Sequence, residues 1–232
     1  MGGIKKLFLV LLLGLGCSPD DGVYLKEKTE QTFEYVSRAT SKVVNISRDA
    51  SVRVISEDPN GNKTEGSGAY LRYKSYHLVL TAAHVVEGNH SALITAGKER
   101  VIADVVYYDE HNDIAILRLE GLFTRKPLTW RISDVTIGEK VIYTGFPNGY
   151  DALSIQGVTS GFSGSNIVLH SYACYGSSGS AVLDGRGRIV GVVSAIDIGY
   201  AFFELPQIVE DIVIVAPIRS VREDVLLDAL SD

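Results

Sequence analysis

The 232-residue chain has few of the residues that bind metals or build disulfide frameworks. It contains two cysteines, so at most one bridge is available, and a scaffold held together by disulfides is excluded. Its five histidines form no H-E-x-x-H motif, and no pair of cysteines has the spacing of a zinc site. The glycine-rich segments also lack the lysine of a phosphate-binding loop. We therefore expect no metal and no other cofactor.

The chain also has fewer basic than acidic residues, and its apolar runs are short. The 22 lysines and arginines are outnumbered by 28 aspartates and glutamates, which gives a formal net charge of -6. Because a chain this acidic, without a basic patch, is a poor nucleic-acid binder, we expect no nucleic-acid partner. The longest apolar run, residues 7–15, is too short to cross a bilayer, which takes about 20 residues.

The start of the chain has the composition of an export signal. Lys5 and Lys6 precede the apolar run, and Gly16 and Cys17 are followed by a polar stretch. This pattern resembles a bacterial lipoprotein signal, in which Cys17 would become the lipidated first residue and attach the protein to a membrane. The alternative is an ordinary secretory signal with an incidental cysteine. In both cases residues 1–16 are expected to be a signal peptide. The protein would then be exported to the periplasm or cell envelope, and lipidation would make it an outer-membrane lipoprotein.

Three short segments contain a histidine, an aspartate and a serine in settings that suit one reaction. His84 ends T-A-A-H after a β-favouring apolar run, and Asp113 precedes the apolar run I-A-I-L. Ser178 lies in Y-G-S-S-G-S, before a β-hairpin pattern over residues 181–193. A serine hydroxyl is a weak nucleophile until a base takes its proton, and a neutral imidazole can be that base. A buried carboxylate fixes the imidazole tautomer, so together the three predict amide hydrolysis.

Small residues surround the serine. They would let the backbone N–H groups of Gly176, Ser177 and Ser178 turn inward as an oxyanion hole. Cys174 lies four positions before the serine, and its only possible disulfide partner is Cys17 in the N-terminal segment. We therefore expect a free thiol in a pocket wall rather than a bridge.

With these segments the chain resembles a trypsin-like serine protease of the HtrA-like (DegP-like) bacterial branch. The resemblance extends over about residues 41–230. Further segments match the family's first strand region, the strand before the histidine, the G-x-x-V-x-x-x-G-x-P segment, a G-V-T-S-G segment, the strand after the serine, and the closing strand and helix. They are, in that order, residues 43–47, 66–71, 137–149, 157–161, 191–195 and 215–225.

The resemblance implies an all-β fold of two six-stranded antiparallel β-barrels, chymotrypsin-like, with a short C-terminal helix. The many short β-rich runs separated by turn residues agree with it. The protease domain would cover residues 41–232, with barrel 1 at about 41–122 and barrel 2 at about 135–217. Residues 17–40 would form a tether and a helix leading into it. Because the sequence ends at Asp232, we expect no PDZ domain.

The resemblance also implies a serine endopeptidase that cleaves protein or peptide substrates through an acyl-enzyme. His84, Asp113 and Ser178 would form the catalytic triad, and the N–H groups of Gly176 and Ser178 would form the oxyanion hole.

Substrate would bind along Ser194, Ala195 and Ile196. The Ser194 hydroxyl would either contact the triad aspartate or be an ordinary strand serine. Tyr172 stands where relatives that cut after lysine or arginine carry aspartate, so apolar side chains are expected at the cleavage site. Residues 197–211 look like an insertion that walls the pocket or covers it.

Two other functions fit parts of the pattern. A catalytically silent peptide-binding module could share the fold, although all three triad residue types are intact. An esterase-type serine hydrolase is the other alternative. The chain lacks the G-x-S-x-G elbow of lipases, and its order His–Asp–Ser differs from theirs.

Overall fold

The computed structural model describes residues 41–57, 61–119, 121, 123–200 and 206–231. Side chains at 196–210 are outside this description. The expected signal peptide at 1–16, Cys17 and the segment 17–40 lie outside the described residues. Residues from Lys42 onward form one unit, and everything below concerns that unit. No helix among the described residues has the length and apolar character needed to cross a membrane.

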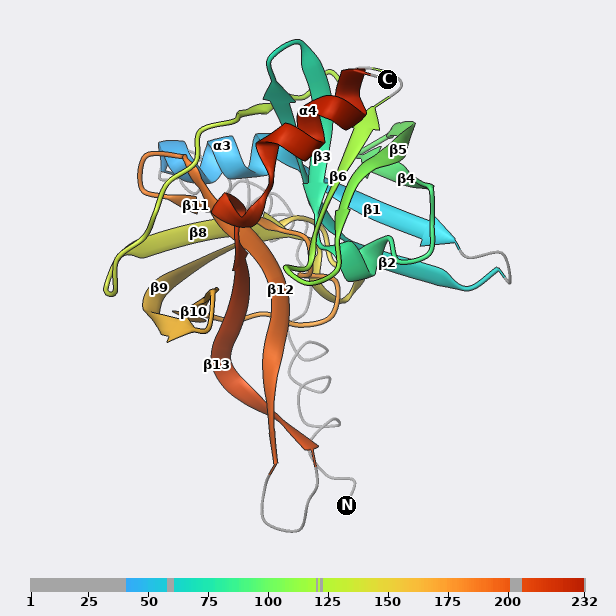
Figure 1. Ribbon diagram of the computed structural model, residues 1–232. Coiled ribbons are helices and arrows are strands. Elements are labelled where there is room, and N and C mark those ends of the chain that lie inside the picture. Colours follow the sequence, from blue (N-terminus) through green and yellow to red (C-terminus); the bar gives the residue numbers. More distant parts are fainter. Residues whose placement is uncertain (1–40, 58–60, 120, 122, 201–205, 232) are drawn as a thin grey trace, which may run out of the picture. The chain divides into compact units, whose positions relative to one another are not determined.

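The first half of the unit is a closed β-barrel (Figure 1). Its strands follow the ring order β1-β4-β5-β6-β3-β2, and antiparallel pairing of β1 with β2 closes the ring. The bounds are β1 Ser51–Glu57, β2 Lys63–Tyr73, β3 Tyr76–Thr81, β4 Ser91–Ala96, β5 Glu99–Asp109 and β6 Ile114–Leu119. The two-residue strand β7, Leu128–Thr129, adds to β2 in parallel.

The second half is also a closed barrel, in the order β10-β13-β12-β11-β8-β9. Its strands are β8 Lys140–Gly145, β9 Leu153–Ser163, β10 Asn166–His170, β11 Ala181–Asp184, β12 Ile189–Tyr200 and β13 Pro206–Pro217. The last two strands continue past the barrel as a two-stranded ribbon, visible in orange and red in Figure 1. Of the stretch expected to be an insertion, residues 197–211, the described parts 197–200 and 206–211 belong to these two strands.

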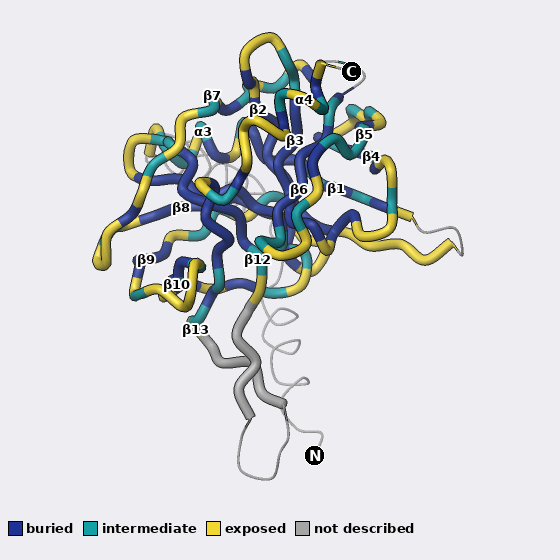
Figure 2. Tube along the Cα trace, in the orientation of Figure 1, coloured by how far each residue is buried: buried dark blue, intermediate teal, exposed yellow. Residues whose placement is uncertain are grey.

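The buried apolar side chains form two clusters, one that fills barrel 1 and continues into barrel 2, and a smaller one within barrel 2. Alternating side chains of the strands point inward, as in β1, where Val52 and Val54 are fully buried. Leu80 and Ile116 belong to the first cluster and Tyr143 to the second. Figure 2 shows buried backbone concentrated in the strands and exposed residues at the turns. The expected fold class, two six-stranded antiparallel barrels, is confirmed.

Helices occupy both ends of the unit. Helix α4, Glu223–Ser231, follows the one-turn helix η3, Ile218–Ser220, and buries Leu226 and Leu230 against the first apolar cluster. The short C-terminal helix is thus confirmed.

Residues 43–47 were expected to be a strand, and that prediction is wrong, because helix α3 spans Lys42–Ala50. Ser47 and Ala50 are buried on one face, and Val43 and Ile46 pack against the core from adjacent positions. This spacing of three and four residues suits a helix. In a window of five residues, V-V-N-I-S reads as β-favouring, and the helical period emerges only when Ala50 is included.

Candidate active site

His84 lies where strand β3 ends. The chain leaves the strand through Ala82 and Ala83, which are fully buried, and enters the one-turn helix η1, Ala83–Val85. The Ser56 hydroxyl donates to the Val85 carbonyl at 2.6 Å and fixes this turn from β1. The imidazole of His84 is therefore presented at the edge of barrel 1 with 44% of its side chain exposed, as a group that must meet substrate requires.

Asp113 is aimed by the tight turn between β5 and β6. Asp109 accepts hydrogen bonds from the backbone and the side-chain amide of Asn112, at 3.0 and 2.7 Å. Asp113 has a φ of 53°, a left-handed conformation that aspartate tolerates better than most residues. The turn thus points the carboxylate towards His84 just before the buried strand begins.

The His84 imidazole and the Asp113 carboxylate are directly bonded. Nδ1 of His84 lies 3.0 and 2.9 Å from the two carboxylate oxygens, and the His84 backbone N–H donates to Oδ1 at 3.0 Å. The Ser194 hydroxyl donates to Oδ2. Of the two roles open for this serine, contact with Asp113 is the one observed.

These contacts shift both protonation equilibria. The hydrogen bond to Asp113 raises the pKa of the His84 imidazole above its ordinary value, although burial opposes it. Burial alone would raise the pKa of the Asp113 carboxyl. The hydrogen bonds from His84 and Ser194 outweigh that effect and hold this pKa below its ordinary value. Asp113 therefore stays ionised at neutral pH and favours a proton on Nδ1 of His84.

Ser178 lies across from this pair, on the loop before β11. Its side chain lines the same pocket as His84. Its hydroxyl donates to the Ser194 carbonyl at 3.4 Å, and within the described part of the chain no hydrogen bond joins it to the imidazole. The hydroxyl must turn from the Ser194 carbonyl before it can give its proton to His84.

Carbonyl groups of the loop around Ser178 accept hydrogen bonds from neighbouring residues, and these bonds fix the orientation of its peptides. The Asn148 N–H donates to the Tyr175 carbonyl at 2.7 Å, and the Ser180 backbone and hydroxyl donate to the Ser177 carbonyl at 3.1 and 2.7 Å. In a trans peptide the N–H points opposite to the C=O. The N–H groups of Gly176 and Ser178 therefore face away from these donors, and neither has an acceptor among the described residues.

The expected inward turn of three successive N–H groups is corrected at one of them. The Ser177 N–H donates to the Cys174 carbonyl at 2.9 Å and so closes a turn instead. Gly176 has a φ of 89°, and a Cβ there would lie 2.6 Å from the Phe146 carbonyl. The tight approach of this loop to neighbouring backbone leaves two N–H groups, not three, for an oxyanion.

Ser67 on β2 fastens this loop to barrel 1, a role that the sequence did not reveal. Its N–H donates to the Ser178 carbonyl at 2.7 Å, and its hydroxyl donates to the Gly176 carbonyl at 2.6 Å. The same hydroxyl accepts from the Phe146 N–H at 2.9 Å. Ser67 is fully buried. The only sequence signal was the small-residue pattern G-S-G, which does not reveal a partner more than a hundred positions away.

A pocket of about 350 Å³ opens beside Ser178. Much of its lining is apolar and comes from Ala173, Val193 and Ala195, with the half-buried free thiol of Cys174. Glu65 is the charged residue of the lining apart from His84. A cavity of this size and character suits an apolar side chain.

Two residues expected to bind substrate lie elsewhere or are not fully described. The Tyr172 side chain is 56% exposed and does not line the pocket, while its carbonyl accepts a hydrogen bond from the Tyr143 hydroxyl. Ile196 pairs with Val213 within the β12–β13 hairpin, and its side chain lies outside the described residues.

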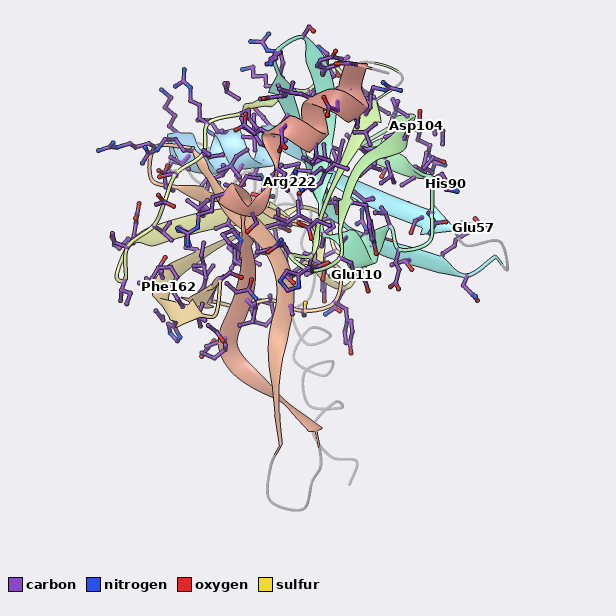
Figure 3. The ribbon with its side chains drawn as sticks, in the orientation of Figure 1. Glu57, His90, Asp104, Glu110, Phe162 and Arg222 are labelled. Atoms are coloured by element: carbon purple, nitrogen blue, oxygen red, sulfur yellow. The ribbon has the colours of Figure 1, made fainter. Side chains whose placement is uncertain are left out.

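A second groove lies on the other side of the imidazole. It is lined by Glu87, Tyr108 and Glu110 together with the His84–Asp113 pair. Glu110, labelled in Figure 3, belongs to the turn that precedes β6. His84 thus lines both the pocket beside Ser178 and a groove that contains three carboxylates. Within the described residues, no group of three or more histidine, cysteine, aspartate or glutamate side chains is arranged to hold a metal ion.

Comparison with protein families gives one match. The sequence model described as "Trypsin-like peptidase domain" matches residues 66–192, more than half of the chain.

Curated relatives carry protease names. Protease Do-like 1, chloroplastic, of Arabidopsis thaliana is 31% identical over 166 residues, covering 65% of this chain and 37% of that protein. Serine protease Do-like HtrA of Lactococcus lactis is 29% identical over 151 residues, 57% of this chain and 37% of that protein. A probable periplasmic serine endoprotease DegP-like of Ectopseudomonas mendocina is 26% identical over 162 residues, 64% and 34%. The chain spans little more than a third of the length of these relatives.

The solved structures agree in fold. The active form of the Rv3671c protease from M. tuberculosis superposes with a TM-score of 0.63 at 24% identity, covering 78% of this chain and 81% of that one. The serine endoprotease from Yersinia pestis gives 0.62 at 20% identity, covering 82% and 68%.

Proposed function

The chain belongs to the trypsin-like peptidase family, and on this premise we propose that it is an HtrA-like serine endopeptidase using His84, Asp113 and Ser178. The observation that carries the proposal is one local arrangement. An imidazole hydrogen-bonded to a partly buried carboxylate shares a pocket with a serine, and the N–H groups of Gly176 and Ser178 have no acceptor among the described residues.

Asp113 prepares the base. By accepting the Nδ1–H of His84 it leaves the lone pair on Nε2 facing the pocket, and its charge stabilises the imidazolium that forms later. When substrate binds, the Ser178 hydroxyl turns from the Ser194 carbonyl to Nε2 and gives up its proton.

The oxyanion and the acyl-enzyme follow. Oγ of Ser178 bonds to the scissile carbonyl carbon, and the carbonyl oxygen becomes an oxyanion that accepts from the N–H groups of Gly176 and Ser178. His84 then protonates the leaving amine as the C–N bond breaks. Water, deprotonated by the same imidazole, cleaves the resulting ester and restores the serine.

The pocket supports the choice of substrate. Its lining, much of which is apolar, would take an apolar side chain next to the scissile bond. Ser194, Ala195 and Ile196 lie on β12, whose backbone can pair with an extended peptide. Tyr172 is exposed and outside the pocket lining, so it would contact only a part of the substrate that extends beyond the pocket.

A fluorophosphonate probe tests the function directly, because it reacts only with a serine that a base has activated. We expect the wild-type chain to be labelled on Ser178 and to cleave casein faster than a short acyl ester. The Ser178→Ala variant serves as the unlabelled control. An unlabelled wild type would favour the silent peptide-binding module, and labelling with ester cleavage alone would favour the esterase.

Export and lipid attachment extend this proposal. They are supported by the charged and apolar start of the chain, by Cys17, and by a DegP-like relative whose name places it in the periplasm. Expressed in a bacterium fed radioactive palmitate, the full chain should incorporate label and move to the membrane fraction, and a Cys17→Ala variant should do neither. Unlabelled wild type recovered from the periplasm would support an ordinary secretory signal.

A further inference from the structure

One of the two oxyanion N–H groups depends on a segment of barrel 2 far from it in sequence. The Gly176 N–H belongs to the same peptide as the Tyr175 carbonyl, and that carbonyl accepts from the Asn148 N–H at 2.7 Å. If the peptide rotated, the Tyr175 oxygen would enter the hole and the Gly176 N–H would leave it. The Asn148 N–H therefore holds this peptide in the orientation that the proposed reaction needs.

The segment that carries Asn148 is not held by regular secondary structure. It forms the one-turn helix η2, Pro147–Gly149, in which Asn148 has a φ of 49° and Gly149 a φ of 73°. Asparagine and glycine adopt this left-handed conformation readily, so the turn itself needs no support. Its position against the Ser178 loop is not set by strand pairing and depends on contacts from other segments.

Arg53 provides those contacts from the other barrel. Its Nη2 donates to the carbonyls of Gly149 and Tyr150 at 3.1 and 2.6 Å. Its guanidinium carbon lies 4.7 Å from the centre of the Phe146 ring, within the range of a cation–π contact. One side chain thus contacts residues on both sides of Asn148.

The guanidinium is itself fixed in place. Its Nη1 is bonded to Glu65 on β2, and only 20% of the Arg53 side chain is exposed. Arg53 also stands opposite Ser67 in the β1–β2 pairing, so both side chains project from the same face of the sheet. Ser67 holds the Gly176 carbonyl directly, while Arg53 acts on the preceding peptide through residues 146–150.

We propose that Arg53 is a positioning residue for the oxyanion hole. It holds residues 146–150 so that the Asn148 N–H keeps the Tyr175 carbonyl, and with it the Gly176 N–H, correctly oriented. The inference rests on the proposed function, because it assigns Arg53 a part in the same reaction. Arg53 does not touch the reacting atoms.

The test is an Arg53→Met variant of the full chain, assayed on a peptide substrate. Removing one oxyanion donor outright costs about 10²–10³-fold in kcat, so loosening one should lower kcat by about ten- to a hundredfold. KM should change less than kcat, because Arg53 itself does not line the pocket beside Ser178, although its partner Glu65 does. A peptide boronate, which forms a tetrahedral adduct, should bind more weakly by the same factor as kcat, whereas a product peptide should bind as before.

Arg48 supplies the matched control. Arg48 lies on helix α3 and also contacts barrel 2, where it donates to the Ala152 carbonyl at 2.8 Å and to the Ser154 hydroxyl. It does not contact residues 146–150. Arg48→Met should retain wild-type kcat within about twofold. Arg53→Lys keeps the charge but has fewer donors, so its kcat should fall less than that of Arg53→Met. If the methionine variant fails to fold, the kcat of the lysine variant is the test.

Three results would overturn the role of Arg53: wild-type kcat in folded Arg53→Met and Arg53→Lys, a loss confined to KM, or an equal loss in Arg48→Met. In each of these cases the wild type would still react with the fluorophosphonate. A wild type that neither reacts nor hydrolyses would instead defeat the proposed function and this inference with it.

Discussion

Replacing Ser178 with alanine is expected to lower kcat by about a millionfold, to the residual rate that the oxyanion hole and substrate binding provide. The hydroxyl supplies the atom that bonds to the acyl group, and no other hydroxyl among the described residues has the same combination of a nearby imidazole and two unpartnered N–H groups. The measurement is the turnover of a peptide substrate at saturation. A dilution series of the wild type, assayed in the same way, gives the lowest activity that can be detected.

The same change should leave the fold intact. The Ser178 hydroxyl makes one long contact of 3.4 Å, whereas the backbone contact that anchors the loop, from the Ser67 N–H to the Ser178 carbonyl, does not involve the side chain. The melting temperature should therefore stay within about 2 °C of wild type. Ser160→Ala, a change at an exposed serine on β9, is the control for both readings.

Substantial turnover by the alanine variant would contradict the assigned nucleophile. If the alanine variant is inactive, a comparison of wild type with this variant also reveals which peptide bonds the protein cleaves. Peptide termini generated in a proteome by wild type and absent with Ser178→Ala should follow apolar side chains, because much of the pocket lining is apolar. An excess of lysine or arginine at these termini would exclude that preference.

Replacing Asp113 with asparagine is expected to lower kcat by about 10⁴-fold at neutral pH. An asparagine amide can donate to Nδ1 of His84 and so place the imidazole proton on Nε2, where the lone pair is needed. Because the His84 backbone N–H donates to Oδ1, the amide oxygen would keep that position and the NH2 would replace Oδ2, where the 2.9 Å contact would have the wrong hydrogen-bond direction.

The pH profile separates this effect from a general disturbance. In the wild type the hydrogen bond to Asp113 raises the imidazole pKa, so His84 stays protonated, and unable to act as a base, up to a pH above the ordinary histidine value of about 6.5. The acidic limb of kcat/KM should therefore lie above that pH in the wild type and move to lower pH in Asp113→Asn, which lacks the charge.

Ser194→Ala is the matched control for the aspartate. It removes one hydrogen bond to the carboxylate but leaves the charge and both contacts to His84. Activity should fall by less than about tenfold, and the acidic limb should stay close to that of the wild type. An Asp113→Asn variant with wild-type kcat and an unmoved limb would exclude the carboxylate from the reaction.

The sequence predicted those features that depend on neighbouring residues. Strands β3 and β6 follow from apolar runs that end or begin beside His84 and Asp113, and the turn after β11 follows from D-G-R-G. Helix α3 was mistaken for a strand because both states fit a short run of valine and isoleucine, and only burial of Ala50 separates them.

Contacts between distant segments could not be predicted in the same way. Ser67 and Arg53 contact backbone carbonyls about a hundred positions away, and a carbonyl leaves no mark in the sequence. The hydroxyl of Ser194 could be placed near Asp113 only as one of two options, because the path of β12 past the first barrel depends on how the barrels pack.

Because of the hydrogen bonds made by Ser67, we expect hydrolysis to become possible only at the end of folding. The loop that bears Ser178, the proposed nucleophile, belongs to barrel 2 but is held by hydrogen bonds from Ser67 of barrel 1. A newly made polypeptide with one barrel formed and the other still unpaired would have all the reactive side chains but no fixed place for the developing negative charge. Proteolytic activity would appear only when both barrels have formed and packed together, so an incompletely folded copy would not cleave other proteins.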